Sequence, residues 1–162
     1  MENNTIIEKL KENFGDSLLK IEAPNGLVTV TTKSEEIISV IQFLKEQMGF
    51  VFLTDLCGIH YPDQDLALGV VYHLHNMKDN VRIRLKAFVS TGKPTISTAT
   101  GLFPAANWME RETFDFYGIL FEGHPNLKRI LNVDYMDYFP MRKEYPLEDP
   151  TRHDKDDRFF GR

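Results

Sequence analysis

The sequence predicts an α+β fold, a two-layer domain with a mixed sheet in the order helix, two strands, helix, three strands, followed by a motif helix and an extended C-terminal tail. Three observations predict it. Apolar residues recur at helical spacing before residue 50, three runs between residues 50 and 89 read as strands, and prolines interrupt the chain after residue 124. A chain of 162 residues fits one domain with its own core. We expect a domain over residues 1–123 and a tail over 124–162.

Two helices and a hairpin are expected at the N-terminal end. Thr5 and Glu8 have the spacing of a capping box, so the first helix should start there and end near Gly15. The extended segments 18–22 and 26–31 flank Pro-Asn-Gly, which favours a hairpin turn. Ser34 is expected to cap a second helix that ends at Gly49 and has apolar residues on one face: Ile37, Ile38, Val40, Ile41, Leu44 and Met48.

Three strands should follow this helix. Residues 50–56 are mostly apolar, which predicts a strand buried on both faces, and residues 66–75 alternate between apolar and other residues. Residues 81–89 alternate most cleanly, with Arg82, Arg84 and Lys86 on the face opposite the core. This basic row faces either solvent or a partner, and both interpretations stay open.

A further helix is expected from about Ala105 to Tyr117, with Pro104 in its first turn and Gly118 as its end. Beyond His124 the chain has prolines at 125, 140, 146 and 150 and no sustained apolar period. Such a segment buries little by itself. We therefore expect the tail to be extended, to lie on a partner rather than on its own domain, and to exchange its amide protons rapidly when the chain is alone.

Composition excludes several classes of function. A net charge of −5 and a pI near 5.5 argue against nucleic-acid binding. Cys57 is the single cysteine, so the chain alone forms no internal disulfide and holds no Cys-ligated iron–sulfur cluster. The chain has no apolar run long enough to span a bilayer and no nucleotide-binding motif of the GxGxxG or P-loop type. From the acidic segment of residues 1–5 we expect no targeting signal. Membrane contact is therefore expected only through partners.

Two alternatives rest on small sets of residues. Glu110, Glu112 and Asp115 could be the paired carboxylates of a hydrolase, although no nucleophile or substrate-binding pattern accompanies them. A zinc site could use the thiol and imidazole groups of Cys57, His60, His73 and His75, but their spacing is looser than that of structural zinc sites. On the helix expected over residues 105–117, Arg111 and Asp115 are four residues apart, which predicts a local ion pair.

Three segments carry a resemblance to a known family. The segment Glu110-Arg111-Glu112-Thr113-Phe114-Asp115-Phe116-Tyr117-Gly118, followed by Phe121, His124-Pro125 and residues 127–131, resembles the diagnostic motif of the 30 kDa (C) subunit of respiratory complex I. Residues 140–147, Pro-Met-Arg-Lys-Glu-Tyr-Pro-Leu, are similar to the family's terminal element. Residues 55–62 resemble its Asp-Leu-x-x-x-Asp-Tyr pattern, with His60 in place of the second acid.

The resemblance implies a non-catalytic structural and assembly subunit in the peripheral arm of a proton-translocating NADH:quinone oxidoreductase. Its partners would be the quinone-site large (D, 49 kDa) subunit and the small cluster-bearing B and I subunits. FMN, iron–sulfur clusters and quinone would be bound by partner subunits, with no catalytic, cofactor or metal residue in this chain. The equivalent subunit of a membrane-bound hydrogenase or ferredoxin-linked complex is the alternative.

The resemblance also implies a peripheral location at the cytoplasmic face of a prokaryotic inner membrane. The motif residues would form the interface with partners, because the charges are mixed with many aromatic residues. These residues are Glu110, Arg111, Glu112, Asp115, Phe116, Tyr117, Gly118, His124, Pro125, Lys128, Arg129, Arg142, Lys143 and Pro146.

Overall fold

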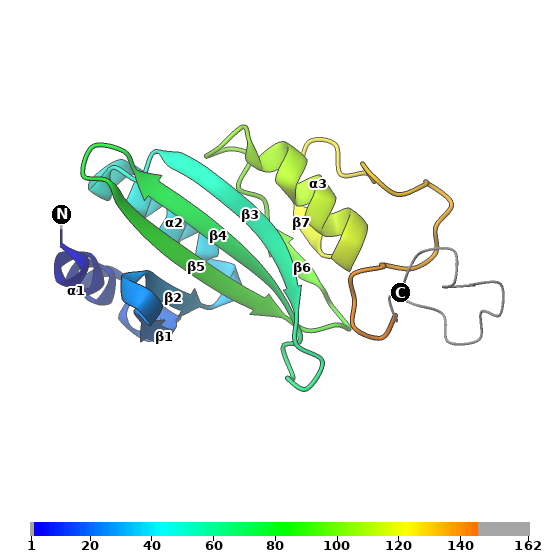
Figure 1. Ribbon diagram of the computed structural model, residues 1–162, viewed down its shortest axis with the longest axis horizontal. Coiled ribbons are helices and arrows are strands. Elements are labelled where there is room, and N and C mark those ends of the chain that lie inside the picture. Colours follow the sequence, from blue (N-terminus) through cyan, green and yellow to red (C-terminus); the bar gives the residue numbers. More distant parts are fainter. Residues whose placement is uncertain (1, 146–162) are drawn as a thin grey trace, which may run out of the picture.

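The computed structural model describes residues 2–145 and shows the predicted α+β architecture. A five-stranded mixed sheet has the order β1-β2-β5-β4-β3, and α2 lies behind it in Figure 1. The predicted order of helix, two strands, helix, three strands and motif helix is confirmed. Two further short strands, β6 (Thr95–Ser97) and β7 (Leu120–Glu122), form a separate parallel pair that the sequence analysis missed.

The helix starts differ from the predictions. Helix α1 (Asn3–Phe14) begins before Thr5 and has no side-chain cap, so the expected capping box is wrong. Ser34 does not cap α2 (Ile37–Met48) either, because residues 34–36 form a separate 3-10 turn before that helix. Gly49 ends α2 in the left-handed region with φ +72°, as glycine readily does.

The sheet combines antiparallel and parallel pairs. Strands β1 (Leu18–Glu22) and β2 (Val28–Thr32) form the predicted hairpin, with Asn25 at φ 52° in its turn. Strand β2 then pairs in parallel with β5 (Val81–Val89). Strands β3 (Phe52–His60) and β4 (Leu68–Asn76) complete the sheet in antiparallel order. The prediction that residues 50–56 are buried on both faces is wrong, since Phe52 is half exposed.

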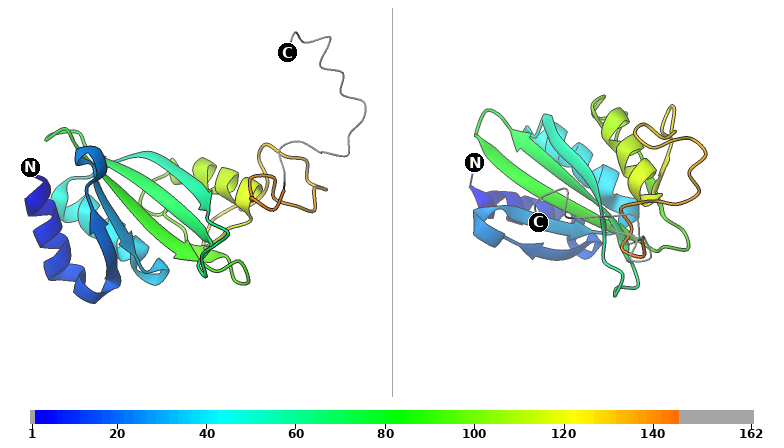
Figure 2. Two further views of the ribbon diagram at one scale, coloured as in Figure 1. Left: turned by 60° about the horizontal axis from the view of Figure 1, so that its bottom comes forward. Right: turned by 45° about the vertical axis from the view of Figure 1, so that its right-hand side comes forward.

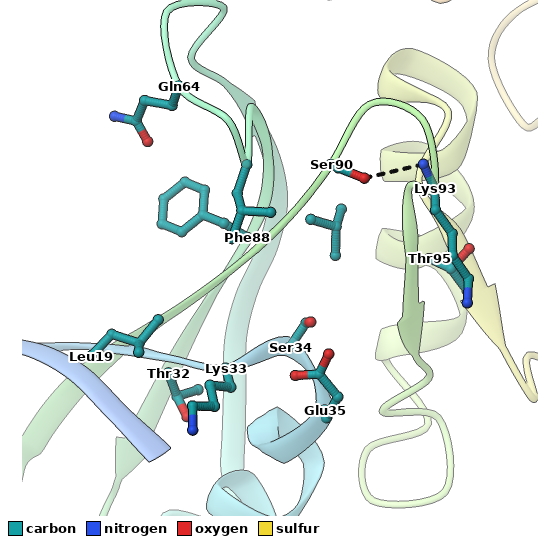
Figure 3. Close-up of a pocket in the computed structure, with 12 residues that line it drawn as sticks. Leu19, Thr32, Lys33, Ser34, Glu35, Gln64, Phe88, Ser90, Lys93 and Thr95 are labelled. Atoms are coloured by element: carbon teal, nitrogen blue, oxygen red, sulfur yellow. Dashed lines mark hydrogen bonds between the residues drawn. The ribbon is translucent and has the colours of Figure 1, made fainter. Parts of the chain in front are cut away.

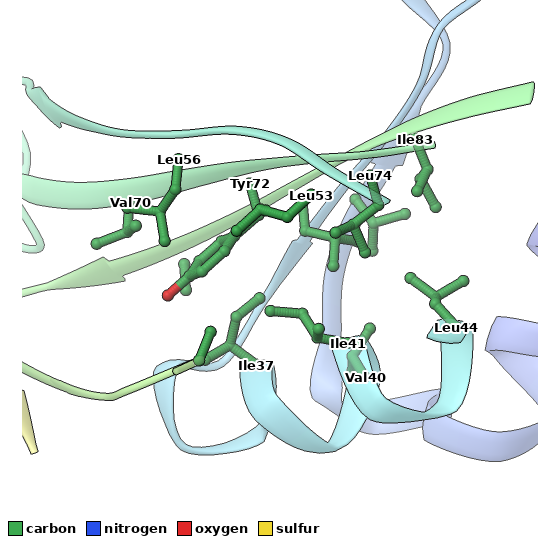
Figure 4. Packing of buried hydrophobic residues seen from close by; sticks show 14 of the residues in the cluster. Ile37, Val40, Ile41, Leu44, Leu53, Leu56, Val70, Tyr72, Leu74 and Ile83 are labelled. Atoms are coloured by element: carbon green, nitrogen blue, oxygen red, sulfur yellow. The ribbon is translucent and has the colours of Figure 1, made fainter. Parts of the chain in front are cut away.

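The core lies between α2 and one face of this sheet (Figure 4). Helix α2 contributes Ile37, Val40, Ile41 and Leu44, which face inward residues of β3, β4 and β5. The side chains of α1 join the same core through Ile6 and Leu10. Full burial of one such side chain contributes about 1.5–3 kcal/mol, so this apolar face fixes the strand register.

Helix α3 (Ala106–Tyr117) packs on β3 at the end of the molecule opposite the N-terminus (Figure 1). Gly58 makes this packing possible, because a Cβ there would lie 2.3 Å from the Tyr117 ring. Residues 124–145, which we call the strap, follow β7 and run alongside α3 (Figure 2). The site described next is formed by α3 and the strap.

Candidate functional site

Asp115 is the centre of the site. Its carboxylate is fully buried and accepts hydrogen bonds from the backbone N–H groups of Ile130, Leu131 and Asn132 at 2.8–3.0 Å. The Asn132 amide donates at 3.1 Å, and the Arg129 guanidinium forms an ion pair at 2.8 Å. This one side chain therefore folds residues 129–132 of the strap around the end of α3.

These donors hold the Asp115 carboxyl in its charged form. Burial alone raises the pKa of Asp115, but the N–H donors of Asn132, Leu131 and Ile130 and the Arg129 guanidinium outweigh burial, so the pKa falls well below its usual range. A carboxylate with this many donors stays ionised at neutral pH. Its chemistry is therefore that of a structural anion rather than of a proton donor.

Arginine side chains tie the strap to the helix. Arg111 donates to the carbonyl oxygens of Lys128 and Arg129 at 3.2 and 3.1 Å, and its guanidinium lies over the Trp108 ring. The predicted local pair of Arg111 with Asp115 is wrong, because the cation that pairs with Asp115 comes from Arg129, fourteen residues later. Arg111 is also buried, so it is no exposed helix residue.

The strap also donates hydrogen bonds to the free backbone carbonyl groups at the C-terminal end of α3. The backbone N–H of Met141 donates to the carbonyl of Phe116, and Arg142 Nε donates to the carbonyl of Tyr117 at 2.7 Å. Helix ends leave such carbonyls without partners inside the helix. Arg129 and Arg142 both lie over the ring of Phe139, with 5.1 and 4.8 Å between each guanidinium carbon and the ring centroid.

His60 stands where the resembling pattern has an acid, and it too serves as a hydrogen-bond acceptor. It is buried at the end of β3, and its Nδ1 accepts the backbone N–H of Lys143 at 3.0 Å. A carboxylate could accept the same hydrogen bond, so an acceptor is kept at this position. His124 has a comparable local role, since its Nδ1 accepts the N–H of Asn126 and its Nε2 lies 3.1 Å from the Asn107 carbonyl.

Glu110 faces a different loop from Asp115. Its fully buried carboxyl accepts from the Ala99 backbone N–H at 2.6 Å and from the Thr98 hydroxyl. Burial raises the pKa of Glu110 to about 7, and the hydrogen bonds from Thr98 and Ala99 only partly oppose this. Through the hydrogen bonds from Ala99 and Thr98, Glu110 anchors the 98–100 loop to α3. The buried Tyr72 hydroxyl, in contrast, has no hydrogen-bond partner among the described residues.

We expect Glu110→Gln to flatten the pH dependence of stability. A carboxyl whose pKa is raised by folding, here from about 4.5 to about 7, stabilises the fold most below pH 4.5. That contribution is lost as the pH rises through 7. Glutamine can accept from Ala99 and donate to Thr98. We measure the free energy of unfolding by urea titration at several pH values between 4.5 and 8. As the pH rises, it should fall less in this variant than in the parent.

The exposed Glu112→Gln is the matched control on the same helix. It should leave the pH profile of the parent unchanged. If the unfolding free energy of Glu110→Gln fell with pH as steeply as that of the parent, the assignment of this titration to Glu110 would be wrong.

The geometry does not assemble either alternative site. Glu110 points to the 98–100 loop and Asp115 to the strap, so the carboxylates of the proposed hydrolase pair are engaged separately. Cys57 pairs with Val71 and His60 with Leu68, which puts these two residues on opposite faces of β3. Although Cys57 is exposed at the surface, partial desolvation, with Asp55 beside it, raises the pKa of its thiol to about 11. Within residues 2–145, no three His, Cys, Asp or Glu side chains are grouped to hold a metal ion.

Two cavities are notable. One of about 250 Å³ lies between β3 and α3 and is lined by Cys57, Glu112, Phe116, Tyr117 and Met141, among others. The other, of about 430 Å³, lies at the far end of β5 and combines the apolar side chains of Leu19, Leu66 and Phe88 with Lys33 and Lys93 (Figure 3). Neither cavity contains the buried carboxylates of α3.

The strap exposes apolar side chains on its outer surface. Leu131 and Tyr135 are 66% and 87% exposed, and the other four are between 39% and 49% exposed: Val133, Tyr138, Met141 and Tyr145. Trp108 of α3 is also exposed, with the Arg111 guanidinium over its ring. Exposed aromatic and apolar groups next to arginine are typical of protein interfaces.

The structure brings most of the predicted site residues together. Arg111, Asp115, Phe116, Tyr117, Gly118, Arg129 and Arg142 join α3 to the strap, and the backbones of Lys128 and Lys143 take part. Glu112 and Pro125 are exposed, and Pro146 lies outside the described residues. Sequence reasoning missed Thr98, Asn132 and Phe139. None of these three belongs to a periodic pattern. Only the need of a buried carboxyl for donors could have suggested Thr98, which donates to Glu110, and Asn132, which donates to Asp115.

The contacts bear on the expected division of the chain. The boundary at residue 124 stays a prediction, but its premise that the tail makes few contacts with the domain is wrong for residues 124–145. Rapid amide exchange throughout this part is likewise not expected, since the N–H groups of Ile130, Leu131 and Asn132 are bonded within the chain. The reason is the buried carboxylate, which draws the strap back onto α3.

Comparisons with known proteins agree on one family. Residues 30–151 match the family described as "Respiratory-chain NADH dehydrogenase, 30 Kd subunit". The chain is 44% identical over 151 residues to the C subunit of the NADH-quinone oxidoreductase of Citrifermentans bemidjiense, in an alignment that covers 93% of this chain and 94% of the relative. No helix of the described part is both long and apolar enough to cross a membrane.

Solved structures give the same fold. A trypsin-resistant fragment (1-134) of Nqo5 superposes with a TM-score of 0.69 at 31% identity, covering 78% of this chain and 100% of the fragment. A chain of an archaeal membrane-bound sulfane sulfur reductase, itself a respiratory membrane complex, has a TM-score of 0.75 at 19% identity, covering 89% and 85%. The second likeness concerns the fold alone.

Proposed function

The chain belongs to the respiratory-chain NADH dehydrogenase 30 kDa subunit family, and from this premise we propose that it is a non-catalytic assembly subunit of the peripheral arm of an NADH:quinone oxidoreductase. The observation that carries the proposal is the strap. Asp115 and Arg129 hold it in one conformation, while six of its apolar side chains remain exposed. A pre-ordered apolar surface lowers the entropic cost of binding a partner.

We assign the strap and α3 to the contact with the quinone-site large (D, 49 kDa) subunit and the small cluster-bearing B and I subunits. In this role the chain contributes shape and contacts to the path from NADH to quinone. FMN, the iron–sulfur clusters and quinone would be held by other subunits of the complex. The complex would lie at the cytoplasmic face of a prokaryotic inner membrane, with this chain attached peripherally. A stoichiometric flavin or cluster on the purified chain alone would contradict the proposal.

Replacing Tyr135 or Leu131 with Ser tests the interface. Each side chain is exposed, so the substitution should leave the thermal midpoint of the isolated chain within about 1–2 °C of the parent. Loss of an aromatic or leucine anchor costs about 2 kcal/mol or more in a partner interface, so recovery of the assembled complex should fall at least about tenfold. Recovery is measured on native gels of membranes from cells that depend on the tagged chain.

Val51→Ser is the matched control, since Val51 is 57% exposed before β3 and away from the strap. Its complex should assemble normally. Normal assembly of both strap variants would exclude the strap as the interface. Purification of a complex that contains a nickel-binding subunit and lacks an NADH-oxidising one would favour the hydrogenase alternative.

A further inference from the structure

The outer face of β5 carries a row of cations with no acidic residue beside them in register. Arg82, Arg84 and Lys86 occupy alternate positions, opposite the residues that enter the core. The residues beside them are His75, His73 and Val71 on β4, and Thr29 and Thr31 next to Arg84 and Lys86 on β2. Cross-strand pairs usually place opposite charges together. Here the adjacent strands supply no carboxylate at these positions.

The row makes no direct ion pair elsewhere in the described chain, although the charges of Lys86 and Arg84 help to lower the pKa of Glu22 on β1, after its hydrogen bond from Lys20. Across residues 2–145, none of the three cations lies within 4.0 Å of a carboxylate oxygen; Arg84 Nε instead donates to His73 Nε2 at 2.8 Å. The acids on the same face are Glu22 on β1 and Asp55 on β3, each two strands away. Two strand spacings are about 10 Å, and Glu22 is already paired with Lys20 at 2.7 Å.

The row leads into the larger cavity. Phe88 continues the same alternation after Lys86, and its ring lies against Gly69 of β4, where a Cβ would approach to 2.7 Å. Phe88 lines the cavity of about 430 Å³ with the apolar side chains of Leu19 and Leu66 (Figure 3). Lys33 and Lys93 add two cations to the lining, which includes one carboxylate, Glu35. On the outward side of β5, the three basic side chains are therefore followed directly by Phe88 and the apolar part of the cavity.

The geometry selects the kind of occupant. Alternate residues of a strand are about 6.7 Å apart, so the three cations span about 13 Å, too far for one small anion. A second copy of the chain stacked through the same face would oppose like charges. An extended peptide with acidic residues at alternate positions has the matching spacing and places carboxylates over all three cations.

We propose that Arg82, Arg84 and Lys86 bind an extended acidic segment of a neighbouring subunit, and that an apolar side chain of that segment fills the cavity beside Phe88. The inference rests on the proposed function, because it supplies a second contact to the same assembly. This contact lies on the face of the sheet opposite α2, whereas the strap contact lies at α3.

Lysine footprinting and cross-linking of the purified complex test the proposal. Acetylation with a water-soluble active ester should modify Lys86 at least about fivefold more slowly in the complex than in the isolated chain, while the exposed Lys9 of α1 reacts equally in both. A carbodiimide, which joins an amine to a carboxyl with loss of water, should link Lys86 to an Asp or Glu of a neighbouring subunit within an acidic, extended sequence.

Variants separate the two proposals. The double reversal Arg82→Glu and Lys86→Glu should lower complex recovery at least about fivefold, and the control Lys9→Glu and Lys11→Glu, with the same change of charge, should not. If Lys86 is unprotected in the assembled complex, or if nuclease treatment removes its protection, the acidic-segment proposal is wrong. Neither outcome affects the proposed strap interface. Absence of any assembled complex with the parent chain defeats the proposed function itself.

Discussion

Asp115→Asn is expected to release the strap from α3. The substitution removes the charge that pairs with Arg129 and places an amide NH₂ group where the N–H groups of Ile130, Leu131 and Asn132 now donate. Breaking a buried, hydrogen-bonded ion pair from one side costs about 3–5 kcal/mol. Since each 1.4 kcal/mol is a factor of ten, exchange of these three amides should accelerate at least about a hundredfold. Hydrogen exchange measured by NMR on the isolated chain gives the result directly.

Asp134→Asn is the matched control, because Asp134 is an exposed acid of the same strap. Its amide exchange should equal that of the parent. The pH dependence provides a second check. Folding lowers the pKa of Asp115, so its contribution is fully present above its unfolded pKa of about 3.8 and is lost as the pH falls through the folded value. The difference between parent and Asp115→Asn should therefore persist at pH 5 and narrow under stronger acid; a difference that grew toward acid pH would contradict this role.

Local periodicity predicted the elements but not their long-range partners. The alternation in residues 81–89 gives β5 its observed bounds, because each inward residue is apolar and the outward residues from Arg82 to Lys86 are charged. The same reasoning paired Arg111 with Asp115, since helix residues four apart are neighbours. In the structure Asp115 is buried against the strap, where it pairs with Arg129 and three backbone N–H groups, while Arg111 donates to the carbonyls of Lys128 and Arg129 instead.

The strap lacks the patterns from which a fold can be predicted. Its segments are held by backbone donors and acceptors, such as the Met141 N–H on the Phe116 carbonyl, and any residue type supplies these groups. The family motif pointed to this region because the motif contains both partners, Asp115 and Arg129. It did not indicate that they meet within one chain. The helix start at Ile37 shows a similar limit, because Ser34 has the composition of a cap but lies in a separate turn.

Gly118→Ala should destabilise the junction of α3 and the strap by about 3 kcal/mol. Gly118 ends α3 at φ +72°, where a side chain costs about 1 kcal/mol or more, and a Cβ there would lie 2.5 Å from the Phe139 ring. Forcing extra volume into a packed contact adds about 1–3 kcal/mol. Displacing Phe139 also removes the surface on which Arg129 and Arg142 lie. Urea denaturation of the isolated chain measures the change.

Gly49→Ala separates backbone strain from this clash. Gly49 ends α2 at the same φ of +72°, but a Cβ there would meet only the end of the Asn76 side chain, at 3.2 Å. Its cost should therefore be about 1–2 kcal/mol, mostly backbone strain, with a small shift of the Asn76 side chain. In the double variant Gly118→Ala with Phe139→Ala, the clash is absent, so the combined loss should be smaller than the sum of the two single losses, with a coupling of about 1 kcal/mol or more. Strict additivity, or equal costs at Gly118 and Gly49, would show that the Phe139 ring does not require glycine at the end of α3.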